Sequence, residues 1–193
     1  MSSNSWTQSL FTEQAAGPTL TAASAASMLV AGSPLAGQNR FTIPANTFKV
    51  GDVLTIEATG IVSCAVTTPG TFRFDVRFGA AGVVFDSGAI PLNIVAQTNI
   101  PWYVRIMLSI RSIGATTAAT LWGTGILITP ATIAVPAQTV GPGPGGNILP
   151  WNAVPAISAG FDSTVANVFD SFFTQTYATG SFTCEQYMLS LCT

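Results

Sequence analysis

The segment Val83–Ala89 is the part of the sequence whose residue types and order could most readily do chemistry. It reads Val-Val-Phe-Asp-Ser-Gly-Ala. An apolar strand followed by Asp-Ser-Gly is typical of an aspartic protease, in which two such carboxylates share a proton and activate water. A homodimer would have to supply the second carboxylate, and the bracing apolar-apolar-Gly strand is matched poorly by Ser112–Gly114 and Leu121–Gly123. We interpret Asp86 as a turn residue, because Asp starts β-turns and Gly88 tolerates positive φ; the protease remains a remote alternative.

Other catalytic arrangements lack a key residue. The chain has no histidine, which removes the Ser-His-Asp and Cys-His arrangements and the commonest metal ligand. No phosphate-binding GxxxxGK[ST] motif surrounds Lys49. Two of the isolated carboxylates could still converge in space as they do in a glycosidase. We expect no enzyme and predict no catalytic, cofactor-binding or metal-binding residue. The isolated carboxylates are Asp52, Glu57, Asp75, Asp162, Asp170 and Glu185.

The three cysteines, Cys64, Cys184 and Cys192, follow neither a metal-ligand spacing nor a CxxC pattern. Their odd number argues against a disulfide framework. On one straight strand Cys184 and Cys192 would lie about 26 Å apart, far beyond bridging distance. We expect free thiols packed as small hydrophobic side chains, in a protein made in a reducing cytoplasm.

The composition has few charges for its length of 193 residues. Charged residues make up 7%, hydrophobic residues 48%, and the net charge is −2. No basic surface for nucleic acid is expected. No apolar stretch is long enough for a membrane helix, and Met1–Trp6 lacks the positive region of a signal peptide. A surface with so few charges is best explained by burial against other protein subunits.

From Phe41 onward the hydrophobic period is two, which predicts strands. The clearest are Val53–Thr59, Thr71–Phe78 and Trp102–Arg111. The even-numbered residues of Thr71–Phe78 are expected in the core, and Asp75 is expected to face out and pair with a neighbouring arginine. About eight strands and no helical period predict an all-β fold, a jelly-roll sandwich or a barrel. The less regular candidates are Phe41–Ile43, Val83–Phe85, Ala118–Ile128, Val165–Phe173 and Ser181–Leu191.

Two charge-poor segments interrupt this pattern. Residues 1–38 are rich in Ala, Ser, Thr and Gly, and we interpret them as an N-terminal arm before a domain of residues 39–193. A Pro/Gly-rich loop is predicted at about 131–158, within a stretch that has no charged residue from Ser112 to Phe161. A loop of this length is unusual inside a compact domain and is usually functional or disordered.

Apolar residues in these two segments suggest that the segments order against a partner. We predict that both dock on neighbouring subunits while the sandwich folds independently, because small residues and Pro/Gly bury too little area to offset their ordering entropy. The alternative is a loop that folds back over its own sandwich, with the tryptophans packed locally. The predicted partner-binding residues are Trp6, Phe11, Ile148, Leu149 and Trp151.

The segment Ile43–Gly60 resembles a jelly-roll module of tailed-phage virion proteins. Its Ile-Pro-Ala-Asn-Thr-Phe-Lys-Val-Gly-Asp turn leads into a strand that ends in Gly60. The similarity continues in the strand Thr71–Gly79, in the Pro-Trp-led strand Pro101–Gly114, in Thr164–Asn167 and in Ser181–Cys184. These motifs are turns and strand patterns, and they carry no catalytic residue.

The resemblance implies an antiparallel jelly-roll sandwich of about eight strands in a virion structural protein. The resembled family includes head decoration (cement) proteins as well as tail and fibre modules, and the charge-poor arm and loop favour an assembly role without deciding between head and tail. We expect a capsid decoration (cement) protein that binds the major capsid protein and itself, as a homotrimer on the capsid surface, assembled in the host cytoplasm. Neither nucleic acid nor membrane is an expected partner, and no cofactor is expected. The alternative is a tail or fibre module that binds a receptor or glycan.

Overall fold

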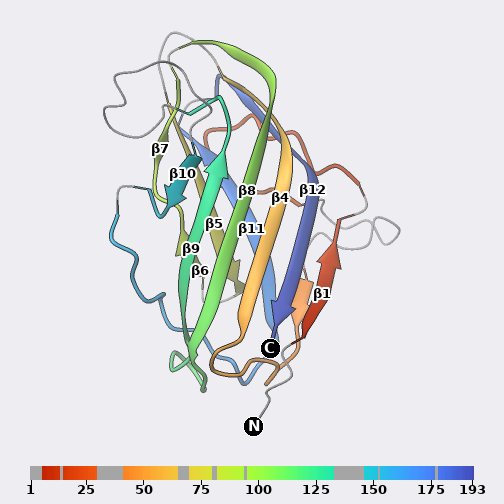
Figure 1. The fold of residues 1–193 in the computed structure, drawn as a ribbon, viewed down its shortest axis with the longest axis vertical. Helices are drawn as coiled ribbons and strands as arrows, with labels where there is room; N and C mark the ends of the chain where they lie inside the picture. The colour runs from red at the N-terminus through yellow and green to blue at the C-terminus, as the bar shows by residue number, and fades with distance from the viewer. Residues whose placement is uncertain are drawn as a thin grey trace.

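Two antiparallel sheets form an all-β sandwich, which confirms the predicted fold class (Figure 1). The computed structural model describes residues 6–13, 15–29, 41–64, 70–79, 82–93, 95–132, 146–151, 153–176 and 178–193. No α-helix occurs among these residues, and none of them forms a helix long and apolar enough to cross a membrane.

The first sheet has six strands in the order β1-β12-β4-β8-β9-β10 and forms the front layer in Figure 1. All neighbouring strands in it are antiparallel. β12, near the C-terminus, lies between β4 and the N-terminal β1. The strands are β1 (Thr7–Thr12), β12 (Ser181–Cys192), β4 (Val53–Cys64), β8 (Gln97–Ser112), β9 (Thr120–Ile128) and β10 (Gly146–Leu149).

The second sheet lies behind the first and has the order β2-β11-β5-β6. Two short strands lie off this path: β3 pairs with β11, and β7 pairs with β5. The strands are β2 (Ala26–Ser27), β11 (Asn167–Gln175), β5 (Thr71–Phe78), β6 (Gly82–Asp86), β3 (Phe41–Ile43) and β7 (Ile90–Pro91).

The strand order is that of a jelly roll. The strands β1-β12-β4-β8 of one sheet face β2-β11-β5-β6 of the other, and consecutive strands such as β4 and β5, or β11 and β12, lie in different sheets. β9 and β10 extend the first sheet beyond this set of eight. The predicted jelly-roll sandwich is therefore observed, and the barrel is not.

Each of the eight strands expected from the sequence is present, within a few residues of its expected bounds. Four further strands, β1, β2, β7 and β10, were not expected. β2 and β7 have two residues each, which is too short to show a period. β10 has four residues and lies inside the predicted Pro/Gly-rich loop, where no strand was expected. β1 has six residues, but as an edge strand it is largely exposed, which hides the alternation.

The expectation that residues 1–38 form an arm without strands is wrong for residues 6–13 and 15–29. β1 pairs with β12, and Leu20 exchanges backbone hydrogen bonds with Phe182. Phe11, Met28 and Leu29 are buried in the chain's own core. These residues contain the first strand of the jelly roll. Residues 1–5, 14 and 30–38 lie outside the described residues.

The loop predicted at about 131–158 also folds against its own sandwich in its described parts. β10 pairs with β9, and Ile157 bridges to Trp122. Leu149 is fully buried, and the Asn147 side chain donates a hydrogen bond to the Thr132 hydroxyl at 2.8 Å. For these residues the alternative left open by the sequence holds. Residues 133–145 lie outside the described residues.

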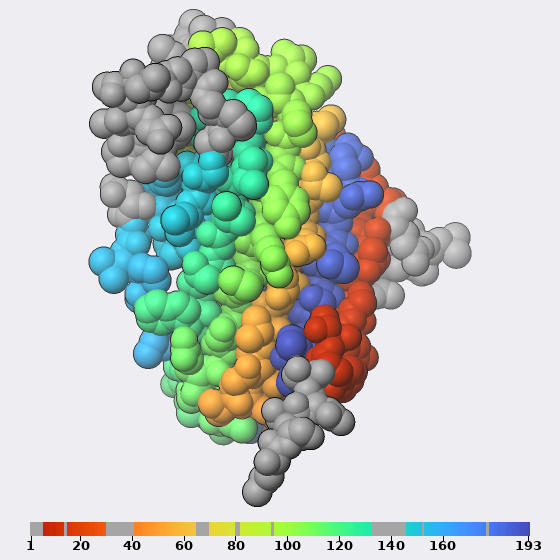
Figure 2. Space-filling view, viewed as in Figure 1, coloured from red at the N-terminus to blue at the C-terminus, as the bar shows by residue number. Residues whose placement is uncertain are grey.

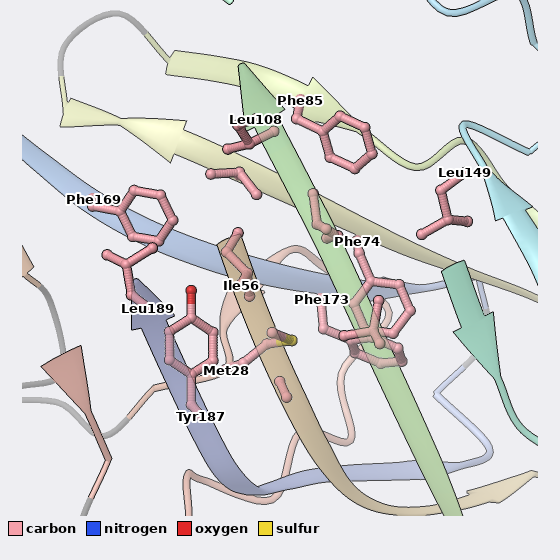
Figure 3. Close-up of a cluster of buried hydrophobic side chains, with 14 of the residues drawn as sticks. Met28, Ile56, Phe74, Phe85, Leu108, Leu149, Phe169, Phe173, Tyr187 and Leu189 are labelled. Atoms are coloured by element: carbon pink, nitrogen blue, oxygen red, sulfur yellow. The ribbon is translucent and has the colours of Figure 1, made fainter. Parts of the chain in front are cut away.

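Aromatic side chains from both sheets fill the core (Figure 3). Trp102 stacks on Phe182 with ring centroids 4.5 Å apart, and its indole N–H donates to the Thr183 carbonyl at 3.2 Å. The buried Tyr187 hydroxyl on β12 is hydrogen-bonded to the Ser171 hydroxyl on β11 at 2.8 Å, which links the two sheets. Burial raises the pKa of Tyr187. The predicted core positions in β5, Phe72, Phe74, Val76 and Phe78, are all buried.

The structure predicts that the N-terminal segment stabilises the isolated domain. Phe11→Ala should lower the free energy of unfolding by about 3 kcal/mol, because it leaves a cavity beside Tyr187. Urea unfolding followed by circular dichroism would measure this change. Trp6→Ala is the matched control, since the Trp6 side chain is 58% exposed, and it should change stability by no more than about 0.5 kcal/mol. An equally small effect of Phe11→Ala would restore the picture of a detachable arm.

Candidate interaction surface

Asp86 is a turn residue, as predicted. Its Oδ1 accepts a hydrogen bond from the Gly88 amide at 2.9 Å and another from Arg73 Nε at 2.8 Å. A second nitrogen of Arg73 bonds Oδ2. The hydrogen bond to Asp86 raises the pKa of Arg73. Gly88 has a φ of 73°, in the left-handed region that glycine tolerates.

A second carboxylate lies opposite Asp86 in the sheet. The register of β5 and β6 pairs Asp75 with Asp86. Asp75 is ion-paired with Arg77 at 2.5 Å, as the sequence suggested, but it is buried rather than outward-facing in solvent. Each carboxylate is paired with its own arginine, Asp75 with Arg77 and Asp86 with Arg73. The arrangement therefore neutralises like charges across two strands and does not reproduce an acid protease dyad.

Two of the other candidate carboxylates, Asp52 and Asp162, have structural partners. Asp52 accepts a hydrogen bond from the Lys49 amide, and Asp162 accepts from the Thr164 hydroxyl and the Thr116 and Thr164 amides. Those hydrogen bonds lower the pKa of Asp162, the Thr164 hydroxyl most. Both residues lie at turns, as expected.

The cysteines are free thiols, as expected. Cys64 and Cys184 are buried, and desolvation raises the pKa of both. Cys192 is partly exposed. A raised pKa keeps a thiol in its less reactive protonated form, which fits packing as small hydrophobic side chains.

The outer face of the first sheet, with the strand order β1-β12-β4-β8-β9-β10, is the face shown in Figure 2. We define this outer face as the side chains of the first sheet that point away from the core. Among the described residues, one ion pair joins neighbouring strands of this face: Glu57 of β4 lies 3.1 Å from Arg105 of β8. The register lines up one outward residue from every strand: Thr12, Met188, Glu57, Arg105, Ile126 and Ile148.

Four exposed apolar side chains gather on one half of the outer face. We call Met107, Ile126, Ile128 and Ile148 the apolar patch. Their exposed fractions are 39%, 37%, 41% and 74%, and the pairing of β8, β9 and β10 places them side by side. Exposed apolar side chains that gather on one face are typical of protein interfaces.

The other half holds a depression of about 350 Å³ where β1 leaves β12, with a lining that is mostly apolar and includes several polar groups. We call it the tyrosine depression. Tyr103 of β8 and Glu57 of β4 lie on one side of it, and Gln186 and Met188 of β12 on the other. Thr12, Glu13, Ala58, Thr59 and Tyr187 complete the lining.

The five residues predicted to bind a partner differ in their burial. Phe11 and Leu149 are buried in the chain's own core, and Trp151 is partly buried against it. The Trp151 amide donates to the Ser87 carbonyl at 2.6 Å, which ties the loop to the Asp86 turn. Trp6 and Ile148 are exposed, and for these two the partner role stays a prediction.

The residues of the tyrosine depression were not singled out in the sequence. Glu57 and Arg105 each stand at outward positions of clearly alternating strands, so their outward orientation was readable. Their pairing was not, because β4 and β8 are separated in the chain by β5, β6 and β7. Gln186 follows a register shift in β12 that the sequence pattern does not reveal.

No family model and no curated protein matches this sequence. Among solved structures, the chain is similar to the CBM2 module of the evolved Dit of Lactobacillus casei BL23 phage J-1. The match has a TM-score of 0.31 and 12% sequence identity, and it covers 78% of this chain and 67% of that chain. At this score the match carries no argument about function.

Asp86→Asn should cost at most about 1 kcal/mol of stability, because the variant keeps the turn hydrogen bond and loses an ion pair that is largely exposed. Thermal or urea unfolding would measure the loss. Incubation of both proteins with an unstructured peptide substrate at acid pH should give no cleavage. Cleavage by the parent chain that disappears in Asp86→Asn would establish the protease instead.

Proposed function

We propose that this chain is a virion structural protein of a tailed phage, and more specifically a capsid decoration (cement) protein. It would bind the major capsid protein and other copies of itself on the capsid surface, without catalytic activity. The observation that carries the proposal is the outer face of the first sheet, where the jelly-roll scaffold presents the apolar patch.

The charge distribution supports an assembly role. On the outer face, Glu57 and Arg105 neutralise each other across neighbouring strands. The apolar patch beside them therefore meets little electrostatic opposition from a neutral partner surface. Burial of the apolar patch against a partner would favour binding by roughly 25 cal/mol per Å² of apolar area removed from water.

The sequence resemblance supports the virion assignment. The segment Ile43–Gly60 spans the end of β3, the turn and most of β4, Thr71–Gly79 contains β5, and Pro101–Gly114 contains most of β8. The resemblance thus falls on strands of both sheets, so it concerns the whole jelly roll rather than one local turn.

Weak single contacts are sufficient for this function. Association of one copy costs translational and rotational entropy, so a small interface alone binds weakly. A decoration protein that contacts several subunits on a symmetric lattice gains avidity, because each further contact is made at a high effective concentration. Contacts that bridge neighbouring capsid subunits would also stiffen the head against internal pressure.

A tail or fibre module that binds a receptor or glycan is the second candidate. The tyrosine depression favours it, because an accessible aromatic side chain among polar groups is what such a module requires. Electron microscopy of virions labelled with antibody against this chain separates the candidates: label over the head supports decoration, and label confined to the tail contradicts it.

Substitution in the apolar patch should abolish attachment to heads. We expect the double variant Ile126→Glu/Ile148→Glu to lose co-sedimentation with heads of the encoding phage prepared without this protein, because each glutamate would have to be desolvated in the interface. Val165→Glu is the matched control: Val165 is 50% exposed and lies before β11 of the other sheet, so this variant should still attach. Undiminished attachment of the patch variant would show that another surface binds the head.

The isolated protein should be a homotrimer. Jelly rolls of the resembled type commonly associate about a three-fold axis, and a surface with few charges favours cover by other copies. Multi-angle light scattering at micromolar concentration should give three times the chain mass of 19.9 kDa. A monomer mass together with a folded circular dichroism spectrum would refute the trimer.

A further inference from the structure

The tyrosine depression has features that the docking of a flat protein surface does not need. It lies where the paired part of β1 ends, at Thr12 opposite Met188. Beyond that pair, the Glu13 amide still donates to the Tyr187 carbonyl at 2.9 Å, so the wall on that side is held by backbone hydrogen bonds. The volume of about 350 Å³ lies within the range of small-molecule sites.

The strands β12 and β1, which line one side of the tyrosine depression, each contain a register shift in their pairing. The pairing of β12 with β4 shifts between Cys184 and Gln186, and the pairing of β1 with β12 shifts between Ser9 and Phe11. Each shift inserts one extra residue, Glu185 in β12 and Leu10 in β1. Bulges of this kind interrupt ladder hydrogen bonds and re-aim side chains, and they are over-represented next to binding sites.

The polar groups at the depression offer both donors and acceptors. The Glu57 carboxylate accepts hydrogen bonds only, the Gln186 amide donates and accepts, and the Tyr103 hydroxyl does both. Glu57 Oε1 lies 3.1 Å from Arg105 Nε, and this ion pair favours one position of the carboxylate beside the depression. Because these groups stand on paired strands rather than on a loop, their spacing is rigid.

The apolar groups complete the match to one class of ligand. Tyr103 and Met188 are partly exposed and place an aromatic ring and a thioether beside the polar groups. A pyranose ring presents the complementary surface: an apolar face of C–H groups and a rim of hydroxyls that each donate and accept. We propose that the tyrosine depression binds an uncharged saccharide, with Tyr103 against the ring face and Glu57 and Gln186 at its hydroxyls.

The charges set the selectivity. Glu57 in the lining is paired with Arg105 beside it, so these two charges offset each other. A charged ligand would have to compete with that ion pair or leave its own charge without a partner. An uncharged sugar avoids both costs. This binding is additional to the proposed decoration role and does not depend on a head or tail location.

The test is a titration of the full chain, labelled with ¹⁵N, with methyl pyranosides of glucose, galactose, mannose, N-acetylglucosamine and rhamnose. We expect at least one of them to shift the backbone amides around Tyr103, Thr59 and Gln186 in a saturable way, with a Kd on the order of 1–10 mM as for a single sugar ring. Methyl glucuronide and methylammonium are the charged probes, and both should bind at least about tenfold more weakly.

Variants distinguish recognition from general stickiness. Tyr103→Ala should weaken binding by about tenfold or more, Tyr103→Phe should keep most of it, and Glu57→Gln should weaken it while keeping the side-chain size. Ser109→Ala, on the same strand and face but outside the depression, is the matched control and should bind as the parent does. The dispersion of each spectrum shows whether the variant is folded.

Three results would overturn the proposal: no saturable shift with any pyranoside, equal binding by a folded Tyr103→Ala variant, or tighter binding of methylammonium than of every sugar. The outcome is separate from that of the decoration role. Sugar binding is measured on the isolated chain without heads, and attachment to heads is measured without sugar.

Discussion

The pairing of the first strand with the last is the interaction on which the rest of this structure depends. β12 has β4 on one side and β1 on the other, and the Trp6 and Thr193 backbones exchange hydrogen bonds at the end of that ladder. Without β1, β12 would be an edge strand with its backbone groups unpaired. The same pairing buries Phe11 against Tyr187 and forms one wall of the tyrosine depression. The pairing of β1 with β12 therefore both completes the sheet edge and forms part of the candidate site.

The few charges of the chain are used in two different ways. In β5 and β6, Asp75 and Asp86 stand opposite each other and each is matched by an arginine, so a pattern that suggested catalysis serves to hold an edge of the second sheet. On the other sheet, Glu57 and Arg105 pair across neighbouring strands of the outer face, and Arg111 lies over the Trp122 ring of β9. Both arrangements reduce the net field of the surface, which suits contact with neutral partners better than contact with nucleic acid.

The outer face combines the apolar patch and the tyrosine depression on one layer of the sandwich. The patch has edge strand β10 at its border and is built from β8, β9 and β10, whereas the depression is built from β1, β12, β4 and β8. Tyr103 stands in the strand that the two halves share. Protein docking and sugar binding would therefore use neighbouring areas, and a partner seated on the apolar patch could leave the depression open at its side.

The sequence by itself determined the fold class, eight of the twelve strands of the described chain, the inward residues of β5 and the turn role of Asp86, because strand period and turn chemistry are local properties of the chain. The tertiary structure decided that residues 6–13 and 15–29 belong to the sandwich, and that Leu149 and Phe11 face their own core. The edge strand β1 is largely exposed and has no alternating pattern, and β10 lies inside the predicted Pro/Gly-rich loop, where no strand was expected. The tertiary structure also decided which outward residues lie together. Glu57, Tyr103 and Gln186 come from three strands that are far apart in the sequence. Only the register of those strands, including the bulge at Glu185, brings the three residues together.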